Sequence, residues 1–399
     1  MNFVDEAKTI HPELIALRRT LHASPEVGLQ LPETQKTVLA ELADLGLDIT
    51  LGTDTTSIVA VLRGGKPGPV VLLRGDMDAL PVTELTDLDF ASTNGAMHAC
   101  GHDLHTAGLV GAAKLLTAHR DELAGSVIFM FQPGEEGEGG AKIMLEEGLL
   151  DVAGERPVAA YAIHVGPGPK GQFGTRPGTI MAGANKLWVT MHGAGGHGSQ
   201  PENSTDPVPP LAEMVTALQT MATRQFSVFD PIVVTVTQLE AGEAINVIPD
   251  TAKLGATIRT LSNKSLDLVI AKTKSLADGI AAAHDCTAEV ELDVSYPVTV
   301  NDDAATAEAL SVLRESFGDD RVVESPDPRM GSEDFSFVLE EVPGTFLFLL
   351  ATPDGIDPDS ATNHSPRIYF DDDVLADQSA ALAQLAWSKL QAAAATAAG

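Results

Sequence analysis

Four short apolar runs, each followed by polar residues, constrain the fold of this 399-residue chain more than any other feature. They span residues 70–73, 127–131, 159–163 and 346–350. Apolar runs of this length are typical of strands buried on both faces of a sheet. Helix-like stretches such as residues 106–118 lie between them, and this alternation of strands with helices predicts a mostly parallel sheet.

The residues that follow these runs are polar and of types that bind metal ions or protons. In chain order they are Asp76 and Asp78, Glu135 and Glu136, His164, and a loop that leads to His364. In parallel sheets, ligands bind beyond the carboxyl ends of the strands. We therefore expect these side chains to meet at one rim of the sheet.

Residues 183–297 follow a different pattern, which predicts an inserted domain. Strand-like and helix-like segments occur there in the order β-α-β-β-α-β, at residues 186–191, 209–225, 232–238, 253–260, 266–284 and 287–294. This is the order of a ferredoxin-like α+β domain. The whole chain also exceeds the roughly 250–300 residues at which single cores stop growing. We predict an α/β domain built from residues 1–182 and 298–399 and interrupted by the inserted domain.

The composition excludes several classes of partner and location. The chain has 25 Lys and Arg against 56 Asp and Glu, a formal charge of −31. Such a charge repels phosphate backbones and anionic lipids, so we expect neither nucleic acid nor a membrane as partner. No stretch approaches the roughly 20 apolar residues that span a bilayer. The two cysteines, Cys100 and Cys286, do not form a disulfide framework, and a cytoplasmic location fits best.

Residues 97–105 concentrate groups that bind metals. This segment contains Cys100 together with three histidines, His98, His102 and His105, just before a helix-like stretch. A thiolate can bridge two metal ions, and an imidazole two residues later can reach one of them. Buried polar packing is the alternative reading of this segment.

Glu135 and Glu136 form the second cluster, directly after a strand-like run. Because adjacent side chains point in different directions, one carboxylate can bind a metal while the other takes a proton from water. A solvated turn is the alternative. The nearby glycines do not indicate a phosphate loop, because no Gly-Lys-Ser/Thr follows them.

Two isolated histidines complete a possible ligand set for two ions. His164 and His364 would each more commonly be structural when considered alone. The combined set is Cys100, His102, Glu136, His164 and His364, with Glu135 left over as a base. We expect Asp78 to accept the second ring N–H of a ligating histidine, with turn capping or direct ligation as alternatives. Asp103 and His105 are expected to pack locally or to support the ligands, and not to bind metal themselves.

In the inserted domain, three side chains are candidate hydrogen-bond donors to a substrate. His197 lies in the glycine-rich segment 192–199, where it is either a loop histidine or a donor to an oxyanion. Asn246 and Arg259 are suited to a carbonyl oxygen and a carboxylate, although each considered alone would be a surface residue. Motifs of serine hydrolases, single-zinc HExxH proteases and nucleotide-driven enzymes are not found in the sequence.

Taken together, these motifs resemble the M20 metallopeptidases, and within them the aminoacylase, hippurate hydrolase and auxin-conjugate hydrolase branch. The resemblance covers nearly the whole chain. It rests on residues 17–22, 25–28, 76–81, 97–103, 131–136, 195–197, 246–249 and 331–335. One departure is Glu202, which follows Pro201 where many relatives have a histidine; it puts lid contacts or substrate preference in question.

The resemblance implies a role for each candidate residue. Cys100 would bridge two ions, one completed by Glu136 and His364 and the other by His102 and His164. Glu135 would be the general base and His197 a catalytic donor, with Asn246 and Arg259 binding substrate. The inserted domain would be a lid that forms a homodimer and can send the residue matching His197 into the partner's active site.

We therefore predict a metal-dependent amidohydrolase that cleaves the linear amide bond of a small-molecule N-acyl amino acid. A metal-activated water and the Glu135 base would yield a carboxylic acid and a free amino acid. Two divalent ions per chain are expected, zinc or manganese, with cobalt and nickel as further candidates. The alternatives are a dipeptidase or deacetylase on the same scaffold, or a non-catalytic metal-dependent binding protein, which would not need a free Glu135. A structural dimerisation module explains none of the rim residues.

Overall fold

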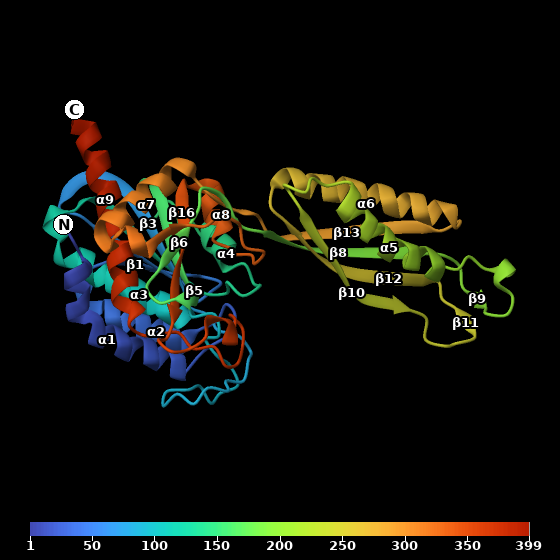
Figure 1. Cartoon of the computed structure of the whole chain (residues 1–399), viewed down its shortest axis with the longest axis horizontal. Helices are drawn as coiled ribbons and strands as arrows, with labels where there is room; N and C mark the ends of the chain where they lie inside the picture. The colour runs from blue at the N-terminus through green and yellow to red at the C-terminus, as the bar shows by residue number, and fades with distance from the viewer. Residues whose placement is uncertain (399) are drawn as a thin grey trace. The chain divides into compact units, whose positions relative to one another are not determined.

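The computed structural model describes residues 1–398, with side chains described as far as residue 394. The chain divides into two compact units (Figure 1). Unit 1 comprises Met1–Ile180, Val300–Asp327 and the chain from Asp334 onward. Unit 2 comprises Met181–Thr299 and the short segment Pro328–Glu333.

Unit 1 is built on an eight-stranded sheet in the order β1-β2-β4-β3-β5-β16-β6-β15. The strands are β1 (Asp48–Leu51), β2 (Ile58–Arg63), β3 (Lys66–Asp76), β4 (Ala124–Gln132), β5 (Pro157–Pro169), β6 (Phe173–Thr175), β15 (Val322–Glu324) and β16 (Gly344–Thr352). The four predicted apolar runs form β3, β4, β5 and β16, and these central strands pair in parallel. The predicted mostly parallel α/β sheet is thus confirmed.

The helices of unit 1 cover this sheet and define its core. They are α1 (Val4–Ala23), α2 (Pro32–Leu42), α3 (His102–Ala118), α4 (Gly140–Glu146), α7 (Asp303–Phe317), α8 (Ser336–Glu341) and α9 (Val374–Ala398). A side chain at Gly111 of α3 would place its Cβ 2.1 Å from Ser379 Oγ on α9. Glycine there lets the two helices approach closely. Gly101, with φ of 84°, lies directly before α3, and the helix starts at His102, four residues earlier than the predicted stretch.

One strand differs from its predicted extent. The run at 159–163 belongs to β5, which continues to Pro169, so His164 lies inside the strand and not at its end. His164 is opposite Phe348 of β16. On its other side β3 pairs with β5 only as far as Arg74, opposite Ala162. His164 therefore still lies at the rim, just beyond the end of the paired part of β3.

Unit 2 has the ferredoxin-like arrangement predicted for the inserted domain. Its sheet has the order β10-β12-β8-β13 with antiparallel neighbours. The elements are β8 (Gly183–His192), α5 (Val208–Arg224), β10 (Ile232–Ala241), β12 (Thr251–Thr260), α6 (Asn263–Ala283) and β13 (Thr287–Tyr296). Two short pairs of strands were not predicted: β9 (Gly196–His197) with β11 (Val247–Ile248), and β7 (Gly178–Met181) with β14 (Thr299–Asn301).

Each unit has its own apolar core. Leu72, Leu109 and Phe129 are buried in unit 1, and Leu187 and Leu254 belong to the core of unit 2. Among the helices of residues 1–398, we find none that combines the length and apolar composition needed to cross a bilayer.

Because the two cores do not share residues, a cavity in one should destabilise that unit selectively. Leu254 is fully buried, so Leu254→Ala should lower the free energy of unfolding of unit 2 by about 2–5 kcal/mol. Hydrogen exchange should accelerate in α5 and α6, while α3 keeps its protection. Equal acceleration in α3 would show that the units do not unfold separately.

Candidate metal centre

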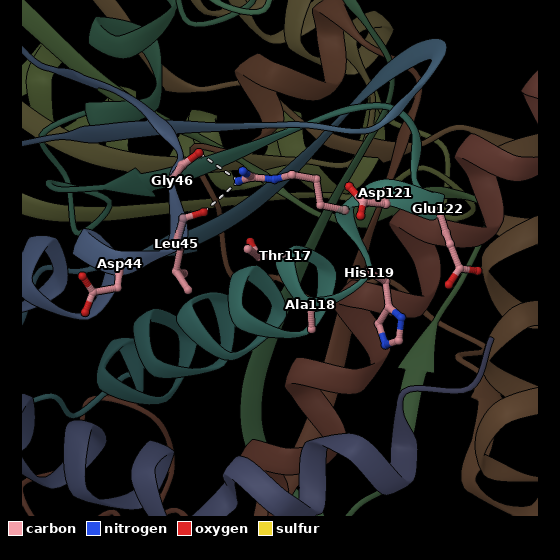
Figure 2. A pocket seen from close by; sticks show the side chains of 9 residues that line it. Asp44, Leu45, Gly46, Thr117, Ala118, His119, Asp121 and Glu122 are labelled. Atoms are coloured by element: carbon pink, nitrogen blue, oxygen red, sulfur yellow. Dashed lines mark hydrogen bonds between the residues drawn. The ribbon is translucent and has the colours of Figure 1, made fainter.

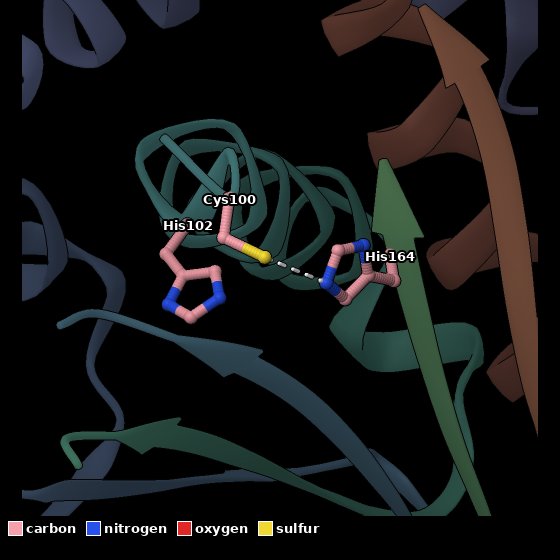
Figure 3. A group of neighbouring side chains, drawn as sticks. All are labelled: Cys100, His102 and His164. Carbon is pink, nitrogen blue, oxygen red and sulfur yellow. Dashed lines mark hydrogen bonds between the residues drawn. The ribbon is translucent and has the colours of Figure 1, made fainter. Parts of the chain in front are cut away.

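Two groups of metal-binding side chains lie at the rim of the unit 1 sheet, and they share one residue. The ligand atoms of Cys100, His102 and His164 all lie within 4.8 Å of one another (Figure 3). The same holds for Cys100, Glu136 and His364. Cys100 is therefore placed to bind in both groups, as a bridging thiolate would. Its Sγ lies 3.3 Å from His164 Nε2.

His164 is held in the tautomer that a metal ligand needs. Its Nδ1 lies 2.6 Å from the carbonyl oxygen of Val165, so Nδ1–H donates there. The lone pair of Nε2 is then directed at Cys100 Sγ, as Figure 3 shows. Burial lowers the pKa of His164 well below its usual value. A neutral imidazole with one nitrogen fixed by a backbone carbonyl is the usual state of a ligating histidine.

His102 lies between two buried carboxylates. Asp76 Oδ2 is 3.5 Å from Nε2 and Asp78 Oδ1 is 3.5 Å from Nδ1. Burial alone would lower the pKa of His102, but the charge of Asp76 and the proximity of Asp78 raise it well above its usual value. The surroundings of this ring therefore favour positive charge.

Several buried polar atoms of the two groups make no hydrogen bond of good geometry. Among the described residues, neither ring nitrogen of His102 has such a partner, and the Oε1 atom of Glu136 has only the His364 ring 3.1 Å away, in an ion pair. Buried polar atoms are normally paired, so an atom of this kind in a native protein needs an explanation. A metal ion would satisfy Glu136 Oε1 and one nitrogen of His102, whose other nitrogen faces a buried carboxylate at 3.5 Å, and the mixed N, S and O donors suit such ions.

Glu135 and Glu136 lie in a loop whose backbone amides donate hydrogen bonds to the side chain of Asp78. Asp78 Oδ1 accepts from the amide of Glu135 and Oδ2 from that of Glu136, both at 3.0 Å. One carboxylate oxygen of each glutamate lies within 4.8 Å of a His102 nitrogen. Asp78 thus contacts both a candidate ligand and the loop that carries the candidate base. Its hydrogen bonds to the loop amides were not predicted from the sequence.

His364 approaches the centre from the loop after β16. Its Nε2 lies 3.1 Å from Glu136 Oε1, and its backbone amide donates to the carbonyl of Ala99 at 2.9 Å. Its φ of 72° is unusual for a non-glycine residue. Such strained conformations persist where surrounding structure enforces them, and they cluster at functional sites.

Two other residues of the 97–105 segment contact side chains that are distant in the sequence, and neither belongs to the two groups that share Cys100. His105 donates from Nδ1 to Asp76 at 2.5 Å and accepts at Nε2 from the amide of Val165 at 2.7 Å, so both nitrogens are occupied. Asp103 is fully buried and lies 2.7 Å from both Arg18 and His22. Arg18 and His22 lie in a motif that supports the family resemblance but received no role from the sequence.

The three candidate donors of unit 2 do not come together within that unit. His197 and Asn246 lie on the arm formed by β9 and β11, where Gly198 N donates to Asn246 O at 2.9 Å. Arg259 lies near the far end of β12 and donates to Ser332 Oγ at 3.0 Å. At about 3.3 Å per residue, most of the length of β12 separates Arg259 from the arm.

A hollow in unit 1, of about 450 Å³, is lined by Asp44, Leu45, Gly46, Thr117, Ala118, His119, Arg120, Asp121 and Glu122 (Figure 2). Arg120 donates there to the carbonyls of Leu45 and Gly46. The hollow lies at the C-terminal end of α3, about 25 Å along the helix from His102. It contributes none of the residues of the two groups, so we do not regard it as the active site.

Comparisons with known proteins identify the family. The chain matches the model of peptidase family M20/M25/M40 over residues 72–388. The chain belongs to this family. It is 36% identical to thermostable carboxypeptidase 2 of Saccharolobus solfataricus, covering 93% of this chain and 94% of the relative. It is 35% identical to N-acetylcysteine deacetylase of Bacillus subtilis, covering 95% and 97%.

The structure is also similar to a solved member of the family. A dinuclear metal-binding peptidase of the M20 family from Bacillus subtilis superposes with a TM-score of 0.83 at 32% identity, covering 96% of this chain and 99% of that one. The resemblance seen in the sequence is thereby confirmed, and this protein is a hydrolase of the M20 family. Two groups of donors sharing Cys100 fit a pair of metal ions.

Metal binding should depend on pH through His364. Hydrogen bonds to Cys100 and Glu136 raise the pKa of His364 to about 10, so in the metal-free protein the ring is protonated at neutral pH. An ion must displace that proton, so affinity should rise about tenfold per pH unit for each proton released. Calorimetric titration with Zn²⁺ between about pH 6 and 8, in buffers of different ionisation enthalpy, measures the release.

The matched variants are His364→Asn and His119→Asn. His119 is a partly buried histidine of unit 1 that pairs with Glu6. Only His364→Asn should reduce the number of protons released. An unchanged proton count in that variant would contradict the assignment of His364 to the centre.

Proposed function

We propose that this protein is a metal-dependent amidohydrolase of the aminoacylase or hippurate hydrolase type, acting on N-acyl amino acids. One observation carries the proposal: Cys100 is common to two groups of ligands, and the buried carboxylate of Glu135 stands beside them without belonging to either Cys100 group. A binding site needs only the ligands. Hydrolysis also needs a base that the ions do not occupy.

We assign the ligands as the two groups indicate. Cys100 bridges, Glu136 and His364 complete one site, and His102 and His164 complete the other. The thiolate favours zinc, while the carboxylate and imidazoles also accept manganese, cobalt or nickel. We propose zinc or manganese as the resident ions. When bound, they would polarise the scissile carbonyl and lower the pKa of water.

Glu135 would move the protons of the reaction. It takes a proton from the attacking water and donates that proton to the amine nitrogen of the scissile bond. The leaving group then departs as a free amino acid. Asp78 fixes the backbone of Glu135 and so limits where its carboxylate can point. His197 would donate to the oxyanion, and Asn246 and Arg259 would hold the substrate's carbonyl and carboxylate.

We also propose a homodimer formed through unit 2. The arm bearing His197 and Asn246 lies nearly the length of β12 away from Arg259, so one copy of unit 2 does not bring them together. The arm's neighbour Ile245 is fully exposed, and Phe229 in the loop before β10 is almost fully exposed. They lie beyond opposite ends of β10, so each end of the unit 2 sheet carries an apolar side chain that a partner could contact. A second copy would let the arm of one chain serve the site of the other.

A cytoplasmic location agrees with the state of the thiols. Cys100 and Cys286 are both free and lie in different units. A free thiolate that binds metal is best preserved in a reducing compartment.

The acyl group decides between the proposed function and its rivals. Apo enzyme reloaded with zinc, manganese or cobalt should release amino acid from N-acetyl, N-benzoyl or indoleacetyl amino acids. Turnover of dipeptides alone would identify the protein as a dipeptidase. Turnover of N-acetyl substrates alone would identify it as a deacetylase. Bound metal with no turnover of any substrate would favour the non-catalytic binding protein.

Glu135→Gln should retain both ions and lower kcat by about 10²–10⁴-fold, the usual contribution of a general base. Metal content by elemental analysis and kcat on the best substrate are the measurements. Glu138→Gln is the matched control, because Glu138 is an exposed carboxylate of the same loop. A fully active Glu135→Gln enzyme would refute the assigned base.

A further inference from the structure

The loop of residues 133–139 carries Glu135 and Glu136. One aspartate that is distant in the sequence accepts hydrogen bonds from the residues at both ends of this loop. We propose that Asp334 is a positioning residue for the reaction: it fixes this loop, and through it Glu135, against the central sheet. The inference rests on the proposed function in that Glu135 is taken as the base. Asp334 lies in the 331–335 motif, to which the sequence pattern assigned no role.

Asp334 spans the two ends of the loop by direct hydrogen bonds. Before the loop, Nε2 of Gln132, the last residue of β4, lies 2.7 and 2.8 Å from its two carboxylate oxygens. After the loop, the amide of Ala141 in α4 donates to Oδ2 at 3.0 Å. The Asp334 side chain is fully buried, so water cannot replace these bonds.

The loop between these ends has little freedom of its own. The amide of Gly140 donates to the carbonyl of Gly134 at 3.1 Å, which closes the loop on itself. A Cβ at Gly140 would lie 1.7 Å from the carbonyl oxygen of Pro133, so the two ends of the loop meet where only glycine fits. Asp78 holds the middle of the loop, and Asp334 holds the ends.

Arg74 stabilises the buried charge of Asp334 and fixes the direction of the Gln132 amide. Its Nη2 lies 3.3 Å from Asp334 Oδ1, and its Nη1 lies 2.6 Å from Asp76 Oδ2. Its Nε donates to Gln132 Oε1 at 2.9 Å. Gln132 must then present its NH₂ group to Asp334. A buried carboxylate is stable only when paired and hydrogen-bonded in this way.

The carboxylate of Asp334 is also close to the group that it positions. One of its oxygens lies within 4.8 Å of a Glu135 carboxylate oxygen. Asp334 itself is in neither of the two groups that share Cys100. It should therefore affect the placement of the base with little effect on metal content.

The test compares Asp334→Asn with the reciprocal double variant Gln132→Glu, Asp334→Asn. In the single variant the introduced NH₂ takes the place of Oδ1 and faces the donors of Gln132 and Arg74, so the anchor is weakened at β4 while the carbonyl can still accept from Ala141. In the double variant the carboxylate introduced at position 132 accepts from Arg74 and from the amide introduced at position 334. The carbonyl of that amide still accepts from the backbone amide of Ala141. The number of carboxylates beside Arg74 is preserved.

We expect Asp334→Asn to bind two metal ions, to keep KM within about twofold, and to lose about 10–100-fold in kcat. Amide exchange in the 133–141 peptide of the metal-loaded protein should accelerate. The double variant should recover slow exchange and most of kcat. Asp377→Asn, which removes a carboxylate from Arg321 elsewhere in unit 1, is the matched control and should change neither readout.

Wild-type exchange and kcat in Asp334→Asn would overturn the proposal, and so would equal losses in Asp377→Asn. If the single variant does not fold, the double variant decides: a loosened loop and low kcat in a folded double variant would also overturn it. The exchange measurement needs no substrate. Failure of the proposed function, seen as no turnover by the wild type, is therefore separable from failure of the Asp334 anchor.

Discussion

The parallel pairing of β4, β3, β5 and β16 is the constraint on which the site depends. Parallel strands all present their carboxyl ends at one edge, so segments distant in sequence must arrive together there. Asp76 at the end of β3, the acids that follow β3 and β4, His164 in β5 and the loop after β16 meet in this way. The thiol comes from the turn before α3, which packs closely on α9 through Gly111. Each element of the centre is thus placed by packing that does not itself involve a metal.

Electrostatics then gives the rim its chemical character. Asp76 and Asp78 flank His102, while Glu136 and Cys100 face His364, and both histidines have raised pKa values as a result. The same negative field that holds a proton on these rings attracts a divalent cation. Arg74 offsets part of this negative charge, because its guanidinium pairs with Asp76 and Asp334. The arrangement lets several carboxylates be buried side by side without all of them being neutralised by protons.

The parts of this structure that the sequence predicted are those with local signals. Apolar runs identified the four central strands, and the alternation of segments in 183–297 identified the ferredoxin-like order. The extent of β5 was missed because the glycines and prolines after Val165 indicate a turn, whereas pairing with β16 keeps them extended as far as Pro169. Tertiary pairing overrode local preference there.

The supporting contacts of the candidate site lacked any such signal. Asp334 and Gln132 are about two hundred positions apart, and Arg18 and Asp103 lie on different helices, so their contacts exist only once the chain is folded. Motifs showed that these residues matter to the family without indicating how. The grouping of Pro328–Glu333 with unit 2 likewise depends on the three-dimensional structure and on no feature of composition.

The candidate ligands are spread along the chain from Cys100 to His364, with the whole of β8 to β13 inserted between His164 and His364. A pair of ions held by these residues would therefore act as a cross-link between the two stretches of sequence, before and after the insertion, that together form unit 1. Closing so long a loop in the unfolded chain is entropically unfavourable, and ions that bind only the folded form shift the equilibrium towards it. Metal supply would then determine the stability of unit 1 as well as its activity, and chelation would lower its resistance to heat and proteolysis.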